Sequence, residues 1–207
     1  DKSVEQTAVN IRQQGGQAIS VPGDVTSAAD VDKIAKLTEE RYGKVDILVN
    51  SVGARPGRER VPVAELEEGA WDKEFNINAK RNFLCCRTVA RHMIDRGGGG
   101  KIINIASTRG KHARRRHAAY CASKAALLIF TQCLACELGA YQINVNAISP
   151  GAVDSERTGY IAAAMSLEPM SPETWRTSKK REQFINNRVA MTPLGRVAEG
   201  SDIARTA

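Results

Sequence analysis

The sequence predicts an α/β fold, a doubly wound parallel sheet with helices on both faces, in a single domain. Short apolar runs typical of buried strands alternate along the chain with longer segments of helical periodicity. The 207 residues, 42% of them hydrophobic, are enough for one core. In such a sheet, ligands bind in the crevice at the carboxyl ends of the strands, so functional polar residues are expected there.

The first half of the chain is expected to alternate between helices, at 3–14, 27–43 and 69–96, and strands, at 17–21 and 45–49. Ser3, with Gln6 three residues later, is typical of a helix start. Ser27 is suited to cap the second helix and Gly43 to end it. The strand at 45–49 leads directly into Asn50.

The second half is expected to contain strands at 102–106 and 143–148, with a helix at 118–138 between them. Residues 154–190 form one long irregular connection, with short helices expected at 158–165 and from Ser171 onwards. Connections of this length usually carry function, so we predict a lid over the crevice. Met165 and Trp175 either line a substrate pocket there or pin the lid to the body.

Three polar residues have an order and spacing suited to proton transfer. Ser107 ends the strand at 102–106, and Tyr120 and Lys124 lie one turn apart on the next helix. An ammonium group beside a phenol favours the phenolate, which can act as an acid or base. The serine hydroxyl supplies a second hydrogen bond to a substrate oxygen. The tyrosine and lysine alone could be a surface pair, but the preceding serine favours a catalytic site.

Further motifs follow in the order typical of the short-chain dehydrogenase/reductase family, which the chain resembles over nearly its whole length. They are Asp24-Val25, Asn50-Ser51-Val52-Gly53, Asn78, Pro150-Gly151-Ala152-Val153-Asp154-Ser155 and Pro193-Leu194-Gly195-Arg196. The resemblance implies a Rossmann-like fold and an oxidoreductase, dependent on NAD or NADP, that interconverts a secondary alcohol and a ketone.

The resemblance also implies roles for single residues. Tyr120 would exchange a proton with the substrate oxygen, Ser107 would hold that oxygen, and Lys124 would contact the nicotinamide ribose. Asn78 would anchor a water that connects Lys124 to solvent. The cofactor residues would be Asp24 and Val25 at the adenine, Asn50 and Gly53 at the adenosine side, and Val153 and Ser155 at the nicotinamide carboxamide. Pro150, Gly151, Tyr120 and Lys124 would contact the cofactor as well.

Two departures from the family pattern concern the cofactor site. Ser51-Val52 replaces the usual Asn-Ala, which puts close packing beside the cofactor in question. Ser155 stands where threonine is commoner, and it keeps the hydroxyl.

The ends of the sequence differ from the family pattern as well. The Gly-rich βαβ unit would precede residue 1 and a last strand would follow residue 207, so we expect a fragment or a partly recorded chain. The choice between NAD and NADP depends on that preceding segment, so neither is preferred.

Positive charge is concentrated in residues 96–136, which hold eight lysines and arginines and no acid, while the whole chain has a net charge of +7. An anionic substrate would explain this, with Arg109 and His112 as contacts. For Arg114–Arg116, a solvated or subunit-interface patch is the alternative. Nucleic acid is not expected, because no aromatic residues interleave with the arginines.

Composition favours a soluble, cytoplasmic protein. We expect no membrane segment, because no run approaches the roughly 20 apolar residues that a spanning helix needs. The five cysteines lie in helical patterns without metal-ligand spacing, so no metal is expected. Apolar residues around the helices at 69–96 and 118–138 predict a homotetramer or homodimer. The alternative functions are a carrier-protein-linked 3-oxoacyl reductase and a non-catalytic dinucleotide-binding scaffold.

Overall fold

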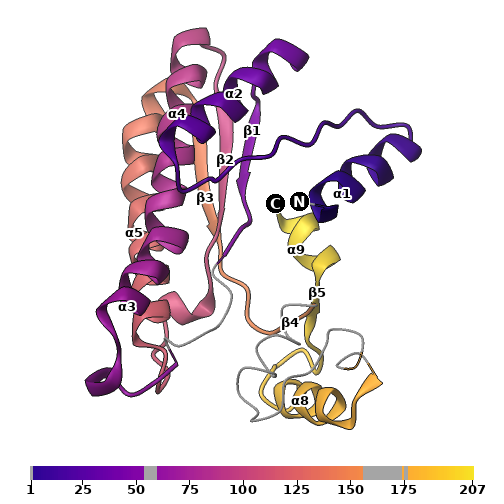
Figure 1. The fold of residues 1–207 in the computed structure, drawn as a ribbon, viewed down its shortest axis with the longest axis vertical. Helices are drawn as coiled ribbons and strands as arrows, with labels where there is room; N and C mark the ends of the chain where they lie inside the picture. Colours follow the sequence, from indigo (N-terminus) through magenta and orange to yellow (C-terminus); the bar gives the residue numbers. More distant parts are fainter. Residues whose placement is uncertain (1, 54–59, 156–173, 175–176) are drawn as a thin grey trace.

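The structure, a computed structural model, describes residues 2–53, 60–155, 174 and 177–207. Its body is a parallel three-stranded sheet of β1 (Ile47–Asn50), β2 (Gly100–Ile105) and β3 (Ile143–Ile148), in that order (Figure 1). Asn50 lies opposite Asn104, and Asn104 opposite Ala147, so the strands end at one edge. The predicted parallel sheet is confirmed.

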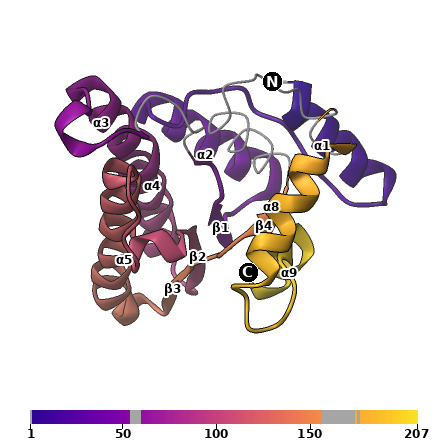
Figure 2. The same cartoon turned by 90° about the horizontal axis from the view of Figure 1, so that it is seen from below.

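Two helices, α4 (Arg81–Arg96) and α5 (Ala118–Leu138), lie side by side along this sheet (Figures 1 and 2). Met93 of α4 packs with Ile102 and Ile143 of the strands in the main hydrophobic cluster. Helix α2 (Ala28–Tyr42) packs on α4 and has the predicted caps, with the Ser27 side chain accepting from the Asp30 amide.

Helix α5 is long and apolar enough to cross a membrane by length and composition, so the expectation that no segment approaches this size was too strong. In the structure α5 packs along β3, and Lys124 from its second turn is buried. The core helix of a soluble protein has these same properties.

The helix predicted at 69–96 is continuous but contains a π-helical turn. It consists of α3 (Glu68–Phe75), the π-turn η2 (Asn76–Lys80) and α4. A π-turn is rare and is often found at functional sites. This one contains Asn78, whose side chain is completely buried.

The strand predicted at 17–21 is wrong, although α1 (Lys2–Gln13) confirms the helix before it. Residues 17–21 pair with no other strand in the described part of the chain. Arg12 of α1 instead donates to the carbonyl oxygen of Ala18 at 2.9 Å. A strand exists only when a neighbour satisfies its backbone groups, and an apolar pattern does not provide that neighbour.

The remaining elements belong to the C-terminal part. Strand β4 (Val153–Asp154) pairs in parallel with β5 (Ala198–Glu199), and α8 (Lys179–Val189) and α9 (Gly200–Thr206) complete it. Short 3₁₀ turns occupy Val63–Glu65 (η1), Thr108–Gly110 (η3) and Gly139–Tyr141 (η4). The predicted short helices at 158–165 and from Ser171 fall outside the described residues.

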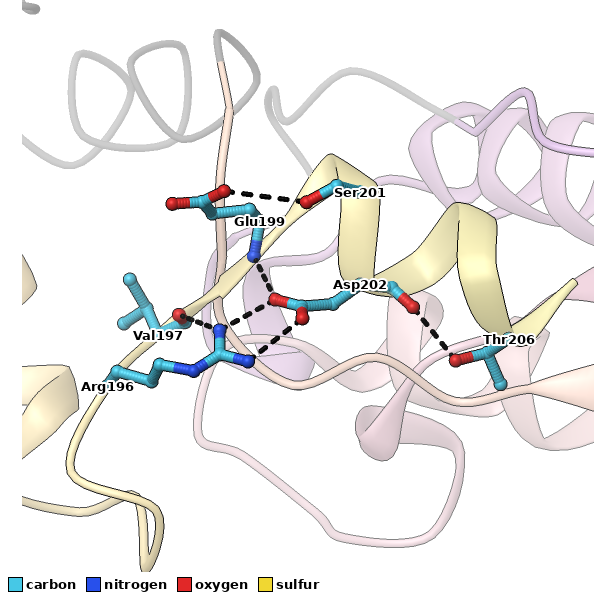
Figure 3. Close-up of polar contacts among 6 residues, drawn as sticks. All are labelled: Arg196, Val197, Glu199, Ser201, Asp202 and Thr206. Carbon is cyan, nitrogen blue, oxygen red and sulfur yellow. Dashed lines mark hydrogen bonds and ion pairs between the residues drawn. The ribbon is translucent and has the colours of Figure 1, made fainter.

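A polar clip joins β5 to α9 (Figure 3). Arg196 donates two hydrogen bonds to the Asp202 carboxylate, at 2.7 and 2.9 Å. The same carboxylate accepts from the backbone N–H of Glu199 at 2.8 Å and so caps α9. Because β5 pairs with β4, this clip also supports Val153, a residue of the site described next.

Candidate active site

A cavity of about 470 Å³ lies at the carboxyl ends of the strands. Its walls come from segments that follow each strand and from α8: Ser51–Gly53, Ile105–Arg109, Pro150–Val153, Ser155, Phe184 and Arg188. Open α/β sheets bind ligands at this position, and the volume is typical of a small-molecule site.

Ser107, Tyr120 and Lys124 all line this cavity. Ser107 follows β2, and its Oγ accepts a hydrogen bond from the backbone N–H of Arg109 at 3.1 Å. Its own hydroxyl proton is therefore left to be donated elsewhere. The structure thus confirms that the three residues lie together, as their order and spacing in the sequence predicted.

Lys124 is buried, with 3% of its surface exposed. Its Nζ donates to the carbonyl oxygen of Ile105 at 2.8 Å, which fixes the ammonium group at the end of β2. Tyr120 lies one turn earlier on α5 and is half-buried. A cation held at this place stabilises negative charge on a group in the same cavity.

Asn78 of η2 is buried and does not line the cavity. Its Nδ2 donates to Glu74 Oε2 at 2.6 Å and to Ser123 Oγ at 3.1 Å. The Ser123 hydroxyl in turn donates to the carbonyl oxygen of Tyr120 at 2.9 Å. The π-turn is thereby joined to the turn of α5 that carries the tyrosine. Glu74 and Ser123 were missed from the sequence, although Ser123 stands on the helix between the predicted tyrosine and lysine.

Seven of the predicted cofactor residues line the cavity: Gly53, Tyr120, Lys124, Pro150, Gly151, Val153 and Ser155. Apart from its two chain neighbours, no atom of the described residues lies within 4 Å of the position that a Cβ would take on Gly151. Backbone groups are therefore accessible where the strands end, which fits a flat dinucleotide lying across the sheet edge.

Asn50 is buried beneath the strand ends and is not part of the cavity wall. Its Nδ2 donates to Asn104 Oδ1 at 2.8 Å and to Cys86 Sγ at 3.3 Å. Burial raises the pKa of the Cys86 thiol to about 12, so this sulfur stays neutral. Asn50 thus links β1 to β2 by a buried hydrogen bond next to the strand ends that form the site.

Asp24 and Val25 precede α2 and lie outside the cavity lining. The Asp24 carboxylate is exposed and accepts from the backbone N–H and hydroxyl of Thr26, and these bonds lower its pKa. Val25 packs against the buried cluster around Val31 and Leu84. Their contact with the adenine stays a prediction.

The predicted substrate residues have different outcomes. Arg109 lines the cavity, whereas His112 is exposed and does not. Arg114 turns into the cavity, while its neighbours Arg115 and Arg116 are exposed. Met165 and Trp175 lie outside the described residues.

His117 lines the cavity in place of His112. Its Nδ1 lies 2.8 Å from the carbonyl oxygen of Arg115, and its Nε2 lies 3.0 Å from Nη1 of Arg60. A carbonyl can only accept and a guanidinium can only donate, so the ring is neutral with its hydrogen on Nδ1. Burial lowers the pKa of His117. The hydrogen bond to the Arg115 carbonyl raises this pKa, but nearby arginines lower it further.

Arg60 and Arg188 also line the cavity and were missed from the sequence. Each is far along the chain from Ser107 and Tyr120, in a segment with no motif. Their approach to Ser107 and Tyr120 results from the fold, and no local pattern signals it.

Comparison with known proteins gives the family. Residues 1–166 match the family described as short chain dehydrogenase. The chain belongs to this family of oxidoreductases. The predicted family and enzyme class are thereby confirmed.

Individual relatives agree with this result. The chain is 34% identical to the sorbitol dehydrogenase of Cereibacter sphaeroides over 98% of its own length and 75% of that protein. It is 31% identical to the 2,3-dihydro-2,3-dihydroxybenzoate dehydrogenase of Bacillus subtilis strain 168, over 98% of its own length and 73% of that protein. It is also similar to the crystal structure of NAD⁺-bound xylitol dehydrogenase, with a TM-score of 0.79 and 27% identity. The match covers 96% of this chain and 74% of that one.

Proposed function

We propose that this short-chain dehydrogenase interconverts a secondary alcohol and a ketone, with NAD or NADP as cofactor and Tyr120 as general acid and base. The observation that carries the proposal is the meeting of Ser107, Tyr120 and Lys124 in one cavity at the strand ends. Relatives named for sorbitol and for a dihydrodiol act on secondary alcohols, which supports the same reaction class here.

Two hydroxyl groups act on the substrate oxygen. Tyr120 takes the alcohol proton during oxidation and returns it during reduction. Ser107, whose oxygen already accepts from Arg109, donates its own proton to the same substrate oxygen. Together they fix the oxygen and stabilise the charge that develops on it.

Lys124 supports the tyrosine. Its ammonium is fixed on the Ile105 carbonyl and stands one helical turn from Tyr120, where it stabilises a developing phenolate. Asn78 is bonded to Ser123, the residue before Lys124, which supports a role in connecting this helix turn to solvent protons.

The cavity residues after β1 and β3 would hold the cofactor. Gly53, Gly151, Val153 and Ser155 line the cavity there. When bound, a nicotinamide dinucleotide supplies the hydride acceptor or donor. Asp24, Val25 and Asn50 belong to this proposal as the adenosine end of the site.

We further propose that the chain is a single Rossmann-type domain in which residues 154–190 act as the substrate lid. Helix α8 supports this, because Phe184 and Arg188 reach the cavity from it. A cytoplasmic location is proposed as well. All five cysteines are free thiols, as expected in a reducing compartment.

The test is a spectrophotometric assay of the full-length protein. NAD and NADP are each supplied with a panel of secondary alcohols, and reduced nicotinamide is followed by its absorbance. We expect turnover with at least one cofactor. Tight cofactor binding without hydride transfer to or from any compound would instead favour the non-catalytic scaffold.

A further inference from the structure

The wall of the catalytic cavity carries a concentration of positive charge. Four of its residues are here called the arginine cluster: Arg60, Arg109, Arg114 and Arg188. They come from separate stretches, the loop before η1, η3, the loop before α5, and the last turn of α8. Among the described residues that line this cavity there is no aspartate or glutamate.

Neighbouring groups hold two members of the cluster in place. The neutral His117 ring accepts from Arg60, and its other nitrogen is fixed on the backbone of Arg115. The guanidinium carbon of Arg188 lies 5.1 Å from the centre of the Phe184 ring, a cation–π contact. Guanidinium groups held in advance lose less conformational freedom when they bind an anion.

These charges repel one another. Burial lowers the pKa of Arg114, and the other three members of the cluster lower it further, Arg188 most. Burial and Arg109 lower the pKa of Arg188 as well. In the part of the chain that the structure describes, no ion pair joins Arg109, Arg114 or Arg188 to a carboxylate, and Asp154 of β4 is bonded to Arg181 instead. An anion between them would remove the repulsion.

We propose that the arginine cluster binds a dianionic group of the substrate, which is therefore a small secondary alcohol or ketone bearing a phosphate monoester or two carboxylates. The proposal rests on the proposed function, since the reacting oxygen would lie at Tyr120 in the same cavity. Guanidinium groups bind phosphate and carboxylate through paired hydrogen bonds. A neutral polyol would bring no opposite charge to Arg109, Arg114 and Arg188.

The first test measures binding without turnover in the full-length protein. Inorganic phosphate and malonate, a dicarboxylate, are titrated by calorimetry into wild type, Arg114→Gln and Arg188→Gln. The matched control is Arg115→Gln, since Arg115 adjoins Arg114 but is exposed and outside the cavity lining. Losing a hydrogen bond to a charged group should weaken binding about tenfold or more.

The control should leave the affinity unchanged. Whichever of phosphate and malonate binds more tightly identifies the anionic group. Equal affinity in wild type, Arg114→Gln and Arg188→Gln overturns the proposal. An equal loss in the Arg115→Gln control also overturns it, because the binding would then reflect general surface charge.

The second test compares turnover of a polyol with that of its phosphate monoester or dicarboxylate analogue. We expect wild type to prefer the dianion, and the preference to collapse in Arg114→Gln and Arg188→Gln with the cofactor KM unchanged. A raised cofactor KM instead would assign the cluster to the cofactor phosphates. A rate that needs an acidic carrier protein and disappears at a few hundred millimolar salt would assign it to carrier docking. Either result overturns the proposal.

The two tests separate this inference from the proposed function. If wild type oxidises no alcohol at all, the proposed function fails, and the calorimetry still decides whether the cluster binds a dianion.

Discussion

The proposed mechanism depends most directly on the hydroxyl group of Tyr120. Tyr120→Phe removes only that oxygen, so cofactor affinity should hold while turnover falls by about 10²–10⁴-fold, as for a lost general acid or base. Steady-state kinetics and a cofactor titration measure the two effects. Tyr141→Phe, at an exposed tyrosine, is the control. Near-normal turnover of Tyr120→Phe would contradict the mechanism.

Lys124 combines two expected roles, binding the cofactor ribose and stabilising the phenolate. Lys124→Ala should therefore weaken cofactor binding and raise the pH that alcohol oxidation requires. The control is Lys101→Ala, because Lys101 is exposed on β2. A cofactor titration and a pH–rate profile are the measurements. If both matched wild type, Lys124 would have only a structural role.

The neutral state of His117 makes the stability of the folded chain dependent on pH. Its pKa is lowered from 6.5, so below that pH the unfolded chain binds a proton that the folded chain resists. The contribution of neutral His117 to the free energy of unfolding should be complete above pH 6.5 and should decline as the pH falls below this value. His117→Gln should flatten this part of the curve in denaturant unfolding at several pH values. His112→Gln, at an exposed histidine, should leave the curve unchanged.

The sequence predicted that Ser107, Tyr120 and Lys124 lie together, but it predicted the other residues of the cavity wall less well. Ser107, Tyr120 and Lys124 sit close together in the chain, on one strand end and one helix face, so their spacing carried the information. Arg60 and Arg188 approach His117 and Arg114 only through the tertiary fold. The choice of His112 over His117 failed because the loop at 110–117 has no periodicity that shows which side chains turn inward.

Among the elements, the clip between β5 and α9 should be sensitive to acid. The Asp202 carboxylate receives Arg196 and the Glu199 amide, which hold its pKa well below 3.8. It therefore contributes stability that is complete above that value and is lost as the pH falls further. Asp202→Asn should reduce the slope of unfolding free energy against pH in this acid range. Asp95→Asn, at an exposed carboxylate on α4, is the control, and equal slopes in all three proteins would refute the idea.

Element types followed from local pattern wherever packing agreed with it. Caps at Ser27 and Gly43 and the periodicity of 118–138 predicted α2 and α5 correctly. The π-turn at 76–80 was not predicted, because one extra residue in a turn barely changes the apolar pattern. The strand at 17–21 failed because pairing, which is not local, decides whether an extended run becomes a strand.

For the molecule as a whole, function depends on segments that are far apart in sequence. The cavity combines residues after β1, β2 and β3 with α8, and the basic wall has contributions from residues 60 to 188. A parallel sheet brings its strand ends to one edge, so the position of the site could be predicted from the order of elements. Its charge could be predicted only in part, since a count of arginines does not show which ones turn inward.

The oligomeric state can be predicted from apolar residues on the surface of α4 and α5. Several apolar residues of the two helices that predicted an interface are buried within the chain itself, among them Leu84, Val89 and Leu127. Phe83 on α4 and Ile129 on α5 remain 43% and 59% exposed, and Phe83 lies edge-on to Phe130 of α5. Exposed apolar side chains on two packed helices fit a symmetric contact between copies.

We therefore predict that the full-length protein is a homotetramer, with a dimer as the second expectation. Ile129→Glu would bury a charge in that contact and should shift the mass measured by light scattering towards smaller species. Val63→Glu is the control, because Val63 is 71% exposed and belongs to η1 instead of to α4 or α5. A monomer mass for wild type at micromolar concentration would refute the assembly. An unchanged mass in Ile129→Glu would place the contact elsewhere, since a buried glutamate without a partner could not be accommodated between the two helices and their copies.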